Sequence, residues 1–369
     1  MKKTVKNVIC EKDACRLGKV GGQAVLEGVM MKAGDHTVTT CRKEDGTLAV
    51  VCEDFVSKRT KYKILDLPII RGVVSFIESM ALSVKTMTAS ADAMGIEEED
   101  GKFERWLKKH FGIRVTDFIM GIALVLGLLL SVFLFMFLPN AVADLINYLS
   151  GGKIGVFRAV IEGVAKVGIF LGYLALVSLM PDIKRTFMYH GAEHKSIACY
   201  EAGDELTPEN AKNHTRFHPR CGTSFMFFMI LLGIAIGFFW RIILPGLDTF
   251  AYTGIKILSL PLLMGLGYEI IRFSGKHDNA FTRALSAPGL WVQRITTKEP
   301  TEDMLEVAII SLKCALRDEN PEFLEFYKSQ PWNKTDADCE DSSDIKIDEP
   351  LSDVQDSEQN GEGMLNDAQ

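Results

Sequence analysis

Apolar residues gather in long uncharged runs that are separated by polar connections. Residues 118–138 contain no charged side chain, and a helix of this length, at about 1.5 Å per residue, crosses a hydrocarbon core of about 30 Å. Residues 160–180 and 221–240 form two more runs, the first with charges only near its start. Residues 253–271 are a weaker candidate, in which Pro261 predicts a kink. The pattern predicts four transmembrane helices, with three as the alternative.

Other stretches have patterns typical of structure outside a bilayer. Residues 36–55 are rich in Thr and Val on both sides of Asp45-Gly46, which predicts a β-hairpin. Residues 71–94 carry apolar side chains at helical spacing with two charges in mid-run, and this favours a helix in the membrane interface or against another domain. The glycines of residues 18–34 lack the spacing of a phosphate loop and predict a glycine-rich loop.

These elements predict an α-helical polytopic membrane protein with a small α+β cytosolic portion. Residues 1–115 should form an N-terminal cytosolic region with the glycine-rich loop, the hairpin and the interfacial helix. Residues 116–272 should form a transmembrane domain with a cytosolic His/Cys loop at 182–220. A C-terminal cytosolic helical region (273–330) and a disordered acidic tail (331–369) should follow. Within the third region, residues 302–317 predict an amphipathic helix.

Charge is distributed unevenly along the chain. Residues 333–369 hold twelve acidic residues and two lysines, a net charge of −10, so the rest carries +3 within the total of −7. The tail also lacks aromatic residues, which predicts disorder. Basic residues cluster on one side of the predicted spans, whereas the two short connections on the other side hold only Lys153. The positive-inside rule then predicts a multi-pass protein of the cell membrane with both termini and residues 182–220 in the cytoplasm.

The lipid bilayer is the partner that the sequence predicts. The eight cysteines include no CxxC pair, which favours a reducing compartment, and the N-terminus lacks the apolar segment of a signal peptide. No nucleic-acid motif occurs, so we expect no nucleic acid as a partner. Protein partners and the oligomeric state are left open.

Residues 189–221 carry the candidate chemistry, because they contain four of the seven histidines. In HGAEH, His190 and His194 stand one helical turn apart with Glu193 beside them, the inverted form of the zinc-protease signature HExxH. In HPRC, His218 lies just before the third apolar run and Cys221 is its first residue. Because the two motifs flank neighbouring spans, the membrane should bring them to the same face.

These residues predict a site for a divalent metal, zinc above all. Four ligands, His190, His194, His218 and Cys221, would form a closed structural site. Replacing one of them by water would leave the open position that catalysis needs, with Glu193 as the general base. Possible supporting residues are His214, Glu27, Gln23, Arg71, Arg220 and Glu269.

Several long motifs connect this chain to a known family. These are GGQAVLEGVMM, DLPIIRG, MPDIKRTFMYHGAEHKSI, HPRCGTSF and SAPGLWVQRITTKEP. Together they resemble the bacterial YqhQ-like membrane family over residues 17–318, and the resemblance implies a metal-dependent enzyme without naming a substrate. The matching positions are Gln23, Glu27, Arg71, His190, Glu193, His194, His218, Arg220 and Cys221. The acidic tail departs from the family pattern.

Two functions of different classes agree with these features. The first is a metal-dependent hydrolase bound to the membrane, with its site at the cytoplasmic face, and Glu193 between the histidines favours it. The second is a non-enzymatic membrane assembly or scaffold protein with a structural zinc site. Cys221 favours this alternative, because thiolate ligands are common in closed zinc sites.

Overall fold

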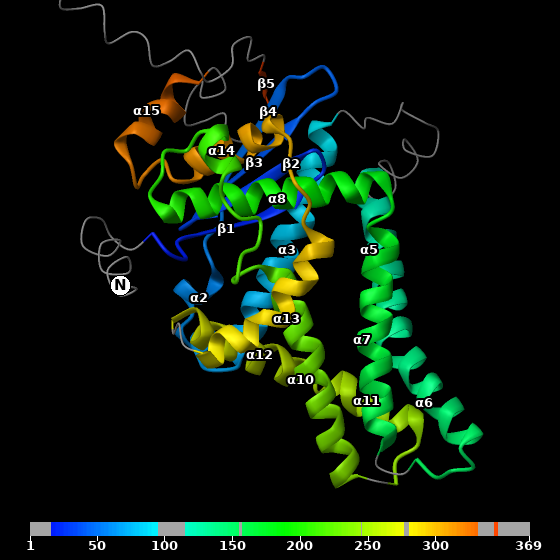
Figure 1. The fold of residues 1–369 in the computed structure, drawn as a ribbon. Coiled ribbons are helices and arrows are strands. Elements are labelled where there is room, and N and C mark those ends of the chain that lie inside the picture. The colour runs from blue at the N-terminus through cyan, green and yellow to red at the C-terminus, as the bar shows by residue number, and fades with distance from the viewer. Residues whose placement is uncertain are drawn as a thin grey trace, which may run out of the picture.

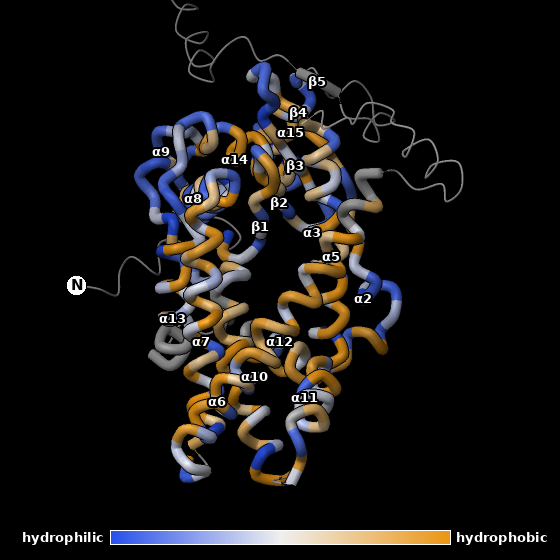
Figure 2. The backbone as a smooth tube through the Cα atoms, turned by 90° about the vertical axis from the view of Figure 1, so that its right-hand side faces the viewer, coloured by the Kyte–Doolittle hydropathy of each residue, from blue (hydrophilic) through white to orange (hydrophobic). Residues whose placement is uncertain are grey.

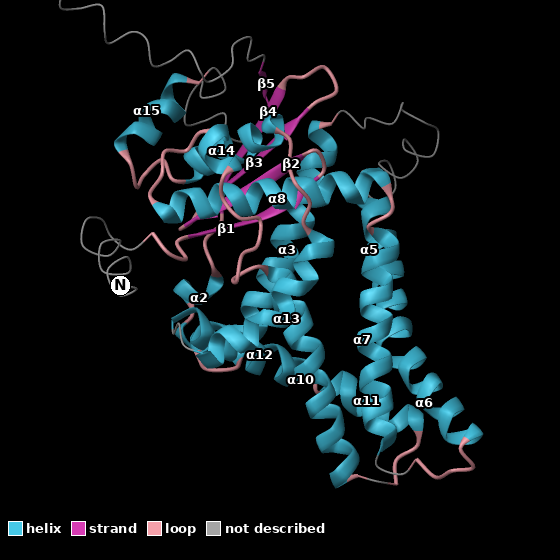
Figure 3. Ribbon diagram, viewed as in Figure 1, coloured by secondary structure: helices cyan, strands magenta, loops and turns pink. Residues whose placement is uncertain are grey.

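The computed structural model describes residues 16–94, 115–154, 157–244, 246–276, 280–330 and 343–345. Figure 1 shows a small antiparallel sheet with its covering helices at one end and a set of long helices that extend away from it. Figure 3, coloured by secondary structure, shows that strands are confined to the first part. The candidate chemistry lies where these two parts meet.

The sheet is an antiparallel meander in which neighbouring strands follow one another in sequence. Its strands are β1 (Val20–Val25), β2 (Gly28–Ala33), β3 (His36–Arg42) and β4 (Leu48–Asp54), with β5 (Ser343–Ile345) paired to β4. The predicted hairpin is confirmed, since β3 and β4 pair around a turn in which Gly46 has a φ of +83°.

The prediction of a glycine-rich loop at residues 18–34 is wrong, because this stretch forms β1 and β2. Its glycines and polar residues hide the alternation that normally reveals a strand. The two strands meet at a tight turn in which Glu27 has a φ of +47°. Gly22 is paired across the sheet with Met31 and lies against a side chain of helix α8, which leaves little space for a Cβ atom.

Helices cover both faces of the sheet. On one face lie α8 (Pro181–Ala202) and α14 (Glu302–Ala315), and on the other lies α3 (Ile70–Ala93). Alternate residues of β2 point to opposite sides, so Val29 and Met31 join the core with α14 while Met30 packs with Leu82 of α3. The sheet is therefore the middle layer of three.

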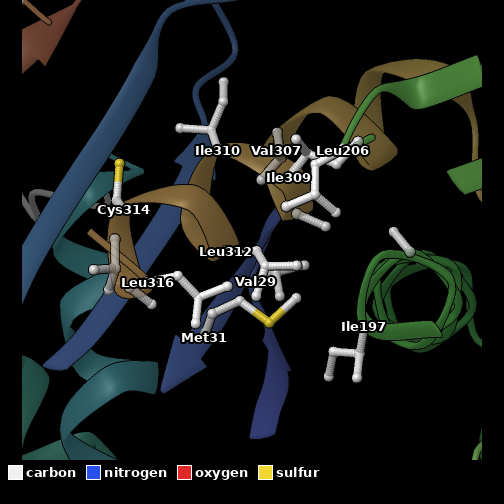
Figure 4. Close-up of a cluster of buried hydrophobic side chains, with 14 of the residues drawn as sticks. Val29, Met31, Ile197, Leu206, Val307, Ile309, Ile310, Leu312, Cys314 and Leu316 are labelled. Carbon is white, nitrogen blue, oxygen red and sulfur yellow. The ribbon is translucent and has the colours of Figure 1, made fainter. Parts of the chain in front are cut away.

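Helix α14 is apolar on all sides and forms the centre of the main core. Figure 4 shows its side chains packed against β2 and against Ile197 of α8. A helix that is hydrophobic all round is stable only when it is buried. The Ser311 hydroxyl lies 3.2 Å from the Val29 carbonyl oxygen and 2.7 Å from that of Val38, which satisfies the polar group inside this core. The helix predicted over residues 302–317 is thus confirmed as Glu302–Ala315, but it is buried around most of its circumference and does not have the single apolar stripe that the sequence predicts.

Within the part of the chain that the structure describes, three helical segments are long and apolar enough to cross a membrane: Gly121–Leu149, Phe157–Val177 and Phe225–Ile243. The first segment is made of α5 (Val115–Val132), the π-helical turn η2 (Phe133–Phe137) and α6 (Leu138–Leu149), which follow one another without a break. The second is α7 (Phe157–Val177), and the third lies in α10 (Gly222–Ile243). The first run is longer than expected, because the helix continues through Pro139 to Leu149. Figure 2 shows the hydrophobic colouring of these helices.

The fourth candidate is a bent pair, α11 (Thr249–Leu258) and α12 (Leu260–Lys276), whose axes differ by 45°. The break falls at Ser259, two residues before Pro261, in agreement with the predicted kink. The other helical elements of the described residues are α2 (Lys58–Lys61), η1 (Lys63–Asp66), α9 (Pro208–Lys212), α13 (Ala280–Thr296) and α15 (Pro321–Ser329).

Two other predicted regions are the loop at residues 182–220 and the acidic tail at residues 331–369. Residues 182–220, which the sequence predicts as a loop, contain most of α8 and all of α9, so the polar stretch is largely helical. The acidic tail lies outside the described residues except for Ser343–Ile345 in β5, and its predicted disorder stays a prediction.

Candidate metal centre

Helix α8 carries the HGAEH motif through the interior of the protein. Pro181 begins the helix, and Gly203, in a left-handed conformation, ends it. Its middle, from Tyr189 to Tyr200, is almost entirely buried against β1, β2 and α14. Polar side chains here are removed from water, and each must find a partner or carry an energetic penalty.

Three side chains come together at this helix. The Nε2 atom of His190 lies 3.2 Å from the Sγ atom of Cys221. His190 and His194 lie with ring centroids 4.4 Å apart. The ligand atoms of His190, His194 and Cys221 all fall within 4.8 Å of one another, so one ion could contact all three. We call these three residues the His/Cys trio.

Backbone carbonyls fix the orientation of both imidazoles. The Nδ1 atom of His190 lies 2.8 Å from the Thr296 carbonyl oxygen, and that of His194 lies 2.6 Å from the Arg216 carbonyl oxygen. A carbonyl only accepts, so each Nδ1 carries the proton and each Nε2 keeps its lone pair. This second layer of hydrogen bonds is the arrangement that orients histidine ligands in metal sites.

The third member of the trio lies at a helix start. Cys221 is the N-cap residue of α10, and its sulfur accepts a hydrogen bond from the Thr223 N–H at 3.4 Å. This contact directs Sγ toward His190. Burial lowers the pKa of His194, although its bond to Cys221 opposes the shift, and the neutral imidazole is the form that binds metals.

Glu193 is a buried carboxylate beside the trio. It is only 5% exposed, and its side chain lies over Gly22 of β1, where an added Cβ would stand 2.9 Å from Oε1. Burial raises the pKa of Glu193, and the nearby His190 and His218 oppose part of this shift. Among the residues that the structure describes, no hydrogen bond or ion pair satisfies this carboxylate.

His218 lies next to the trio but faces another residue. Its ring centroid is 5.6 Å from that of His194, while its Nε2 lies 3.4 Å from Oε2 of Glu201. Gln293 holds the His218 backbone through two hydrogen bonds, at 2.8 and 2.7 Å. Of the four predicted ligands, the structure therefore groups three and places the fourth at the edge of the group.

Glu201 is a residue that the sequence analysis missed. It accepts hydrogen bonds from the Gly18 N–H at 3.0 Å and from Arg220. Burial acts to raise its pKa, but hydrogen bonds from His218 and Gly18 and the charge of Arg220 keep the pKa of Glu201 below its ordinary value. Its position seven residues after His194, on the same face of α8, is the signal that could have identified it.

The other predicted supporting residues take part in contacts outside the trio. His214 bonds Asp204 at 2.9 Å on the surface. The carboxylate of Glu27 binds Arg185 of α8 and accepts a hydrogen bond from the Tyr189 hydroxyl at 3.4 Å. Gln23 connects β1 to Ser83 and Thr86 of α3.

Arg71 and Glu269 form a separate pair between α3 and α12. Two hydrogen bonds, at 2.6 and 2.5 Å, join the guanidinium to the carboxylate. Glu269 also accepts the Ile69 N–H at 3.4 Å, where Ile69 has a φ of +70°, a rare value for a β-branched residue. Arg220 belongs to the Glu201 network described above.

The donor set of the trio fits a transition metal. Two imidazole nitrogens and one sulfur suit zinc better than magnesium or calcium, which prefer oxygen ligands. The fixed Nδ1–H tautomers leave both Nε2 atoms available on the side of Cys221. The residues present therefore satisfy what a zinc ion requires from three protein ligands.

Fold and site define a class of mostly helical protein. Its described residues contain three or four helices long and apolar enough to span a membrane, and a His/Cys trio next to a five-stranded antiparallel meander. The family model described as "Protein of unknown function (DUF1385)" matches residues 67–318, and the chain belongs to this family. The match covers every member of the trio.

The chain is similar to a bacterial protein over most of its length. The chain is 34% identical over 304 residues to "Uncharacterized protein YqhQ" of Bacillus subtilis (strain 168), which covers 80% of this chain and 92% of that protein. No solved structure gives a significant match. The resemblance to the YqhQ-like family is confirmed, while the metal-dependent activity that it implied stays a proposal.

Proposed function

We propose that this protein is a membrane-bound, metal-dependent hydrolase whose site lies at the cytoplasmic face of the cell membrane. Three or four helices with the length and apolar character of spans support the membrane location. The connection that contains the trio is rich in Lys and Arg, which supports its cytoplasmic side. Both termini follow to the same side.

Zinc is the metal that we propose, with His190, His194 and Cys221 as its ligands. A zinc ion in this position would act as a Lewis acid toward a carbonyl or phosphoryl oxygen and lower the pKa of water. The two carbonyl acceptors keep both imidazoles in the ligand tautomer, and the N-cap position keeps Cys221 in place.

The single observation that carries the enzymatic function is the buried Glu193 carboxylate, which has no hydrogen-bond or ion-pair partner among the described residues. A structural site has no use for a buried acid without a partner, whereas a general base must be free to accept a proton. We infer that Glu193 takes a proton from the attacking water while the water oxygen forms a bond to the acyl or phosphoryl centre. Glu193 then returns this proton to the leaving group as the old bond breaks.

A scaffold protein with a structural zinc site is the second candidate, and the position of His218 favours it. Its ring lies beside His194, so a rotation away from Glu201 would supply a fourth protein ligand. The hydrolase instead keeps His218 bonded to Glu201 and leaves the fourth position to water and substrate.

Metal content and hydrolysis of purified full-length variants test the two candidates. Wild-type protein should contain about one zinc ion per chain by elemental analysis, and Cys221→Ser should lose most of it. Glu193→Gln should retain the metal but hydrolyse a panel of ester, phosphodiester and peptide substrates about 10²-fold more slowly or worse. His218→Ala should retain the metal as well.

Three outcomes would contradict the proposal in different ways. Wild-type protein without a transition metal would remove both candidates. Loss of zinc from His218→Ala would identify a closed site and favour the scaffold. Hydrolysis that is equal in wild type and Glu193→Gln would exclude Glu193 as the base.

A further inference from the structure

The segment of residues 56–70, which precedes α3 and includes α2 and η1, exposes an unusual number of apolar side chains. Ile64 is 72% exposed, and three other large side chains of the segment are at least half exposed: Val56, Tyr62 and Leu67. Such an apolar patch on a protein surface indicates contact with a partner or a membrane. We call residues 56–70 the basic-apolar segment.

The same segment is strongly basic. Lys58, Arg59, Lys61 and Lys63 stand within six residues, and Asp66 is its single acidic residue. Lys58, Lys61 and Lys63 are exposed, while Asp66 lies 3.9 Å from Arg59 and compensates only that charge. Exposed cations next to exposed apolar side chains are typical of peptides that lie on anionic membranes.

Contacts with α12 set the height of this segment relative to the proposed bilayer. The Arg59 guanidinium donates to the Tyr268 hydroxyl at 3.0 Å, and Ile69 packs on Gly265 so closely that a Cβ there would stand 2.2 Å from it. Tyr268 lies in the last turn of the bent candidate span, which ends at Ile270. Figure 1 shows α2 beside α12. The segment is therefore held where a span emerges from the apolar layer.

We propose that the basic-apolar segment lies on the cytoplasmic leaflet, with Ile64, Tyr62 and Leu67 among the upper acyl chains and its lysines on anionic phospholipid headgroups. This inference rests on the membrane location proposed above and is independent of the hydrolase chemistry. Charge complementarity favours an anionic lipid surface over an apolar groove of another protein, because a protein groove would leave three exposed lysines unpaired.

The contact with lipid is tested by a tryptophan at the centre of the patch. Ile64→Trp and the control Glu44→Trp, in the exposed β3–β4 turn, are each reconstituted as full chains in nanodiscs whose lipids carry bromine near the glycerol end of the acyl chains. Bromine quenches tryptophan at contact, so the emission added by Trp at position 64 should be strongly quenched and that at position 44 should not. The wild-type emission, which includes Trp240 of α10, is subtracted.

The wild-type signal also distinguishes a failure of the proposed membrane location from a failure of the proposed contact between the basic-apolar segment and lipid. Quenching of the native tryptophans reports membrane insertion itself, so its absence would overturn the membrane location. Normal quenching of the wild type, combined with equal behaviour of positions 64 and 44, would overturn only the present proposal. Blue-shifted emission at position 64 without quenching would show that protein covers the patch, and would overturn it as well.

The preference for anionic lipid is tested by removing charge. In the Ile64→Trp background, short-chain phosphatidylglycerol should change the emission with a defined midpoint, and Lys61→Gln with Lys63→Gln should raise that midpoint by roughly fivefold or more. The matched pair Lys43→Gln with Lys328→Gln removes the same charge elsewhere and should leave the midpoint unchanged. Equal midpoints in both pairs, or an equal response to phosphatidylcholine, would contradict headgroup recognition.

Discussion

Two buried glutamates lie on different helices of the molecule, α7 and α8, and each is 5% exposed. Glu162 of α7 forms an ion pair with Lys256 of α11, and Lys166 stands 4.0 Å from the same oxygen. Glu193 of α8 has no such partner within the described part of the chain. A paired buried carboxylate connects helices, whereas an unpaired one reduces stability and remains free for chemistry. Equal burial thus accompanies two different environments, and the environment of Glu193 is the one that suits the role proposed for it.

The largest effect should follow from breaking the paired site. Glu162→Ala leaves Lys256 buried without a counter-charge and should lower the free energy of unfolding by about 3–5 kcal/mol. Thermal unfolding of the detergent-solubilised protein measures this change. As a control, Lys212→Ala removes a charge that pairs with Glu302, and both of these side chains are exposed, so it should cause a loss of less than about 1 kcal/mol.

A double variant tests whether charge compensation is the cause. Glu162→Leu with Lys256→Met replaces the pair by apolar groups of similar size and should recover most of the lost stability. If the double variant is as unstable as Glu162→Ala, the ion pair is not what connects α7 to α11.

An intermediate effect is expected at the glycine beneath Glu193. A Cβ on Gly22 would stand 2.8 Å from Cγ of Glu193 and 2.9 Å from the Met30 carbonyl oxygen. Gly22→Ala should therefore destabilise the fold by about 1–3 kcal/mol and displace the carboxylate, which reduces hydrolysis. The neighbouring Gly21→Ala meets no atom within 4 Å and should change stability by less than about 0.5 kcal/mol. Equal effects at both positions would contradict close packing over Gly22.

The smallest change in stability should follow from neutralising the unpaired carboxylate. Burial raises the pKa of Glu193 in the folded state, so the folded protein binds a proton on this carboxylate more tightly than the unfolded chain does. The free energy of unfolding therefore falls as the pH rises above the pKa that Glu193 has in the unfolded chain. Glu193→Gln removes that loss and should be as stable as wild type at low pH and equal or more stable near pH 7. Unfolding curves at several pH values test this. A variant that is less stable at neutral pH would indicate a missed partner.

Much of the long apolar helical part could be predicted, because a candidate span needs only a long apolar run. The bend at Pro261 also followed from the residue alone, since proline lacks an N–H group. The sheet was harder to predict. Asp45-Gly46 identified one hairpin, but Gly22 and Glu27 hid the other, because these positions serve close packing with α8 and a tight turn rather than the alternation of a strand.

The candidate site could be predicted to the extent that its residues have reactive side chains. HGAEH and HPRC indicated the trio, and helical spacing placed His190 beside His194. The acceptors that orient the imidazoles are carbonyls of Thr296 and Arg216, and a backbone carbonyl has no signature in the sequence. The direction in which His218 faces was equally hidden, because it depends on Glu201 across the fold.

The covering of the sheet by α14 has a consequence for biosynthesis. Ser311 and Val29 meet across 282 positions of the chain, so the first strands leave the ribosome long before the helix that covers them. At about 5–20 residues per second, the delay is roughly 15–55 s, during which all the candidate spans are also synthesised. For that period the apolar face of the sheet needs a temporary occupant, and nascent chains that end before residue 302 should be the forms that chaperones retain.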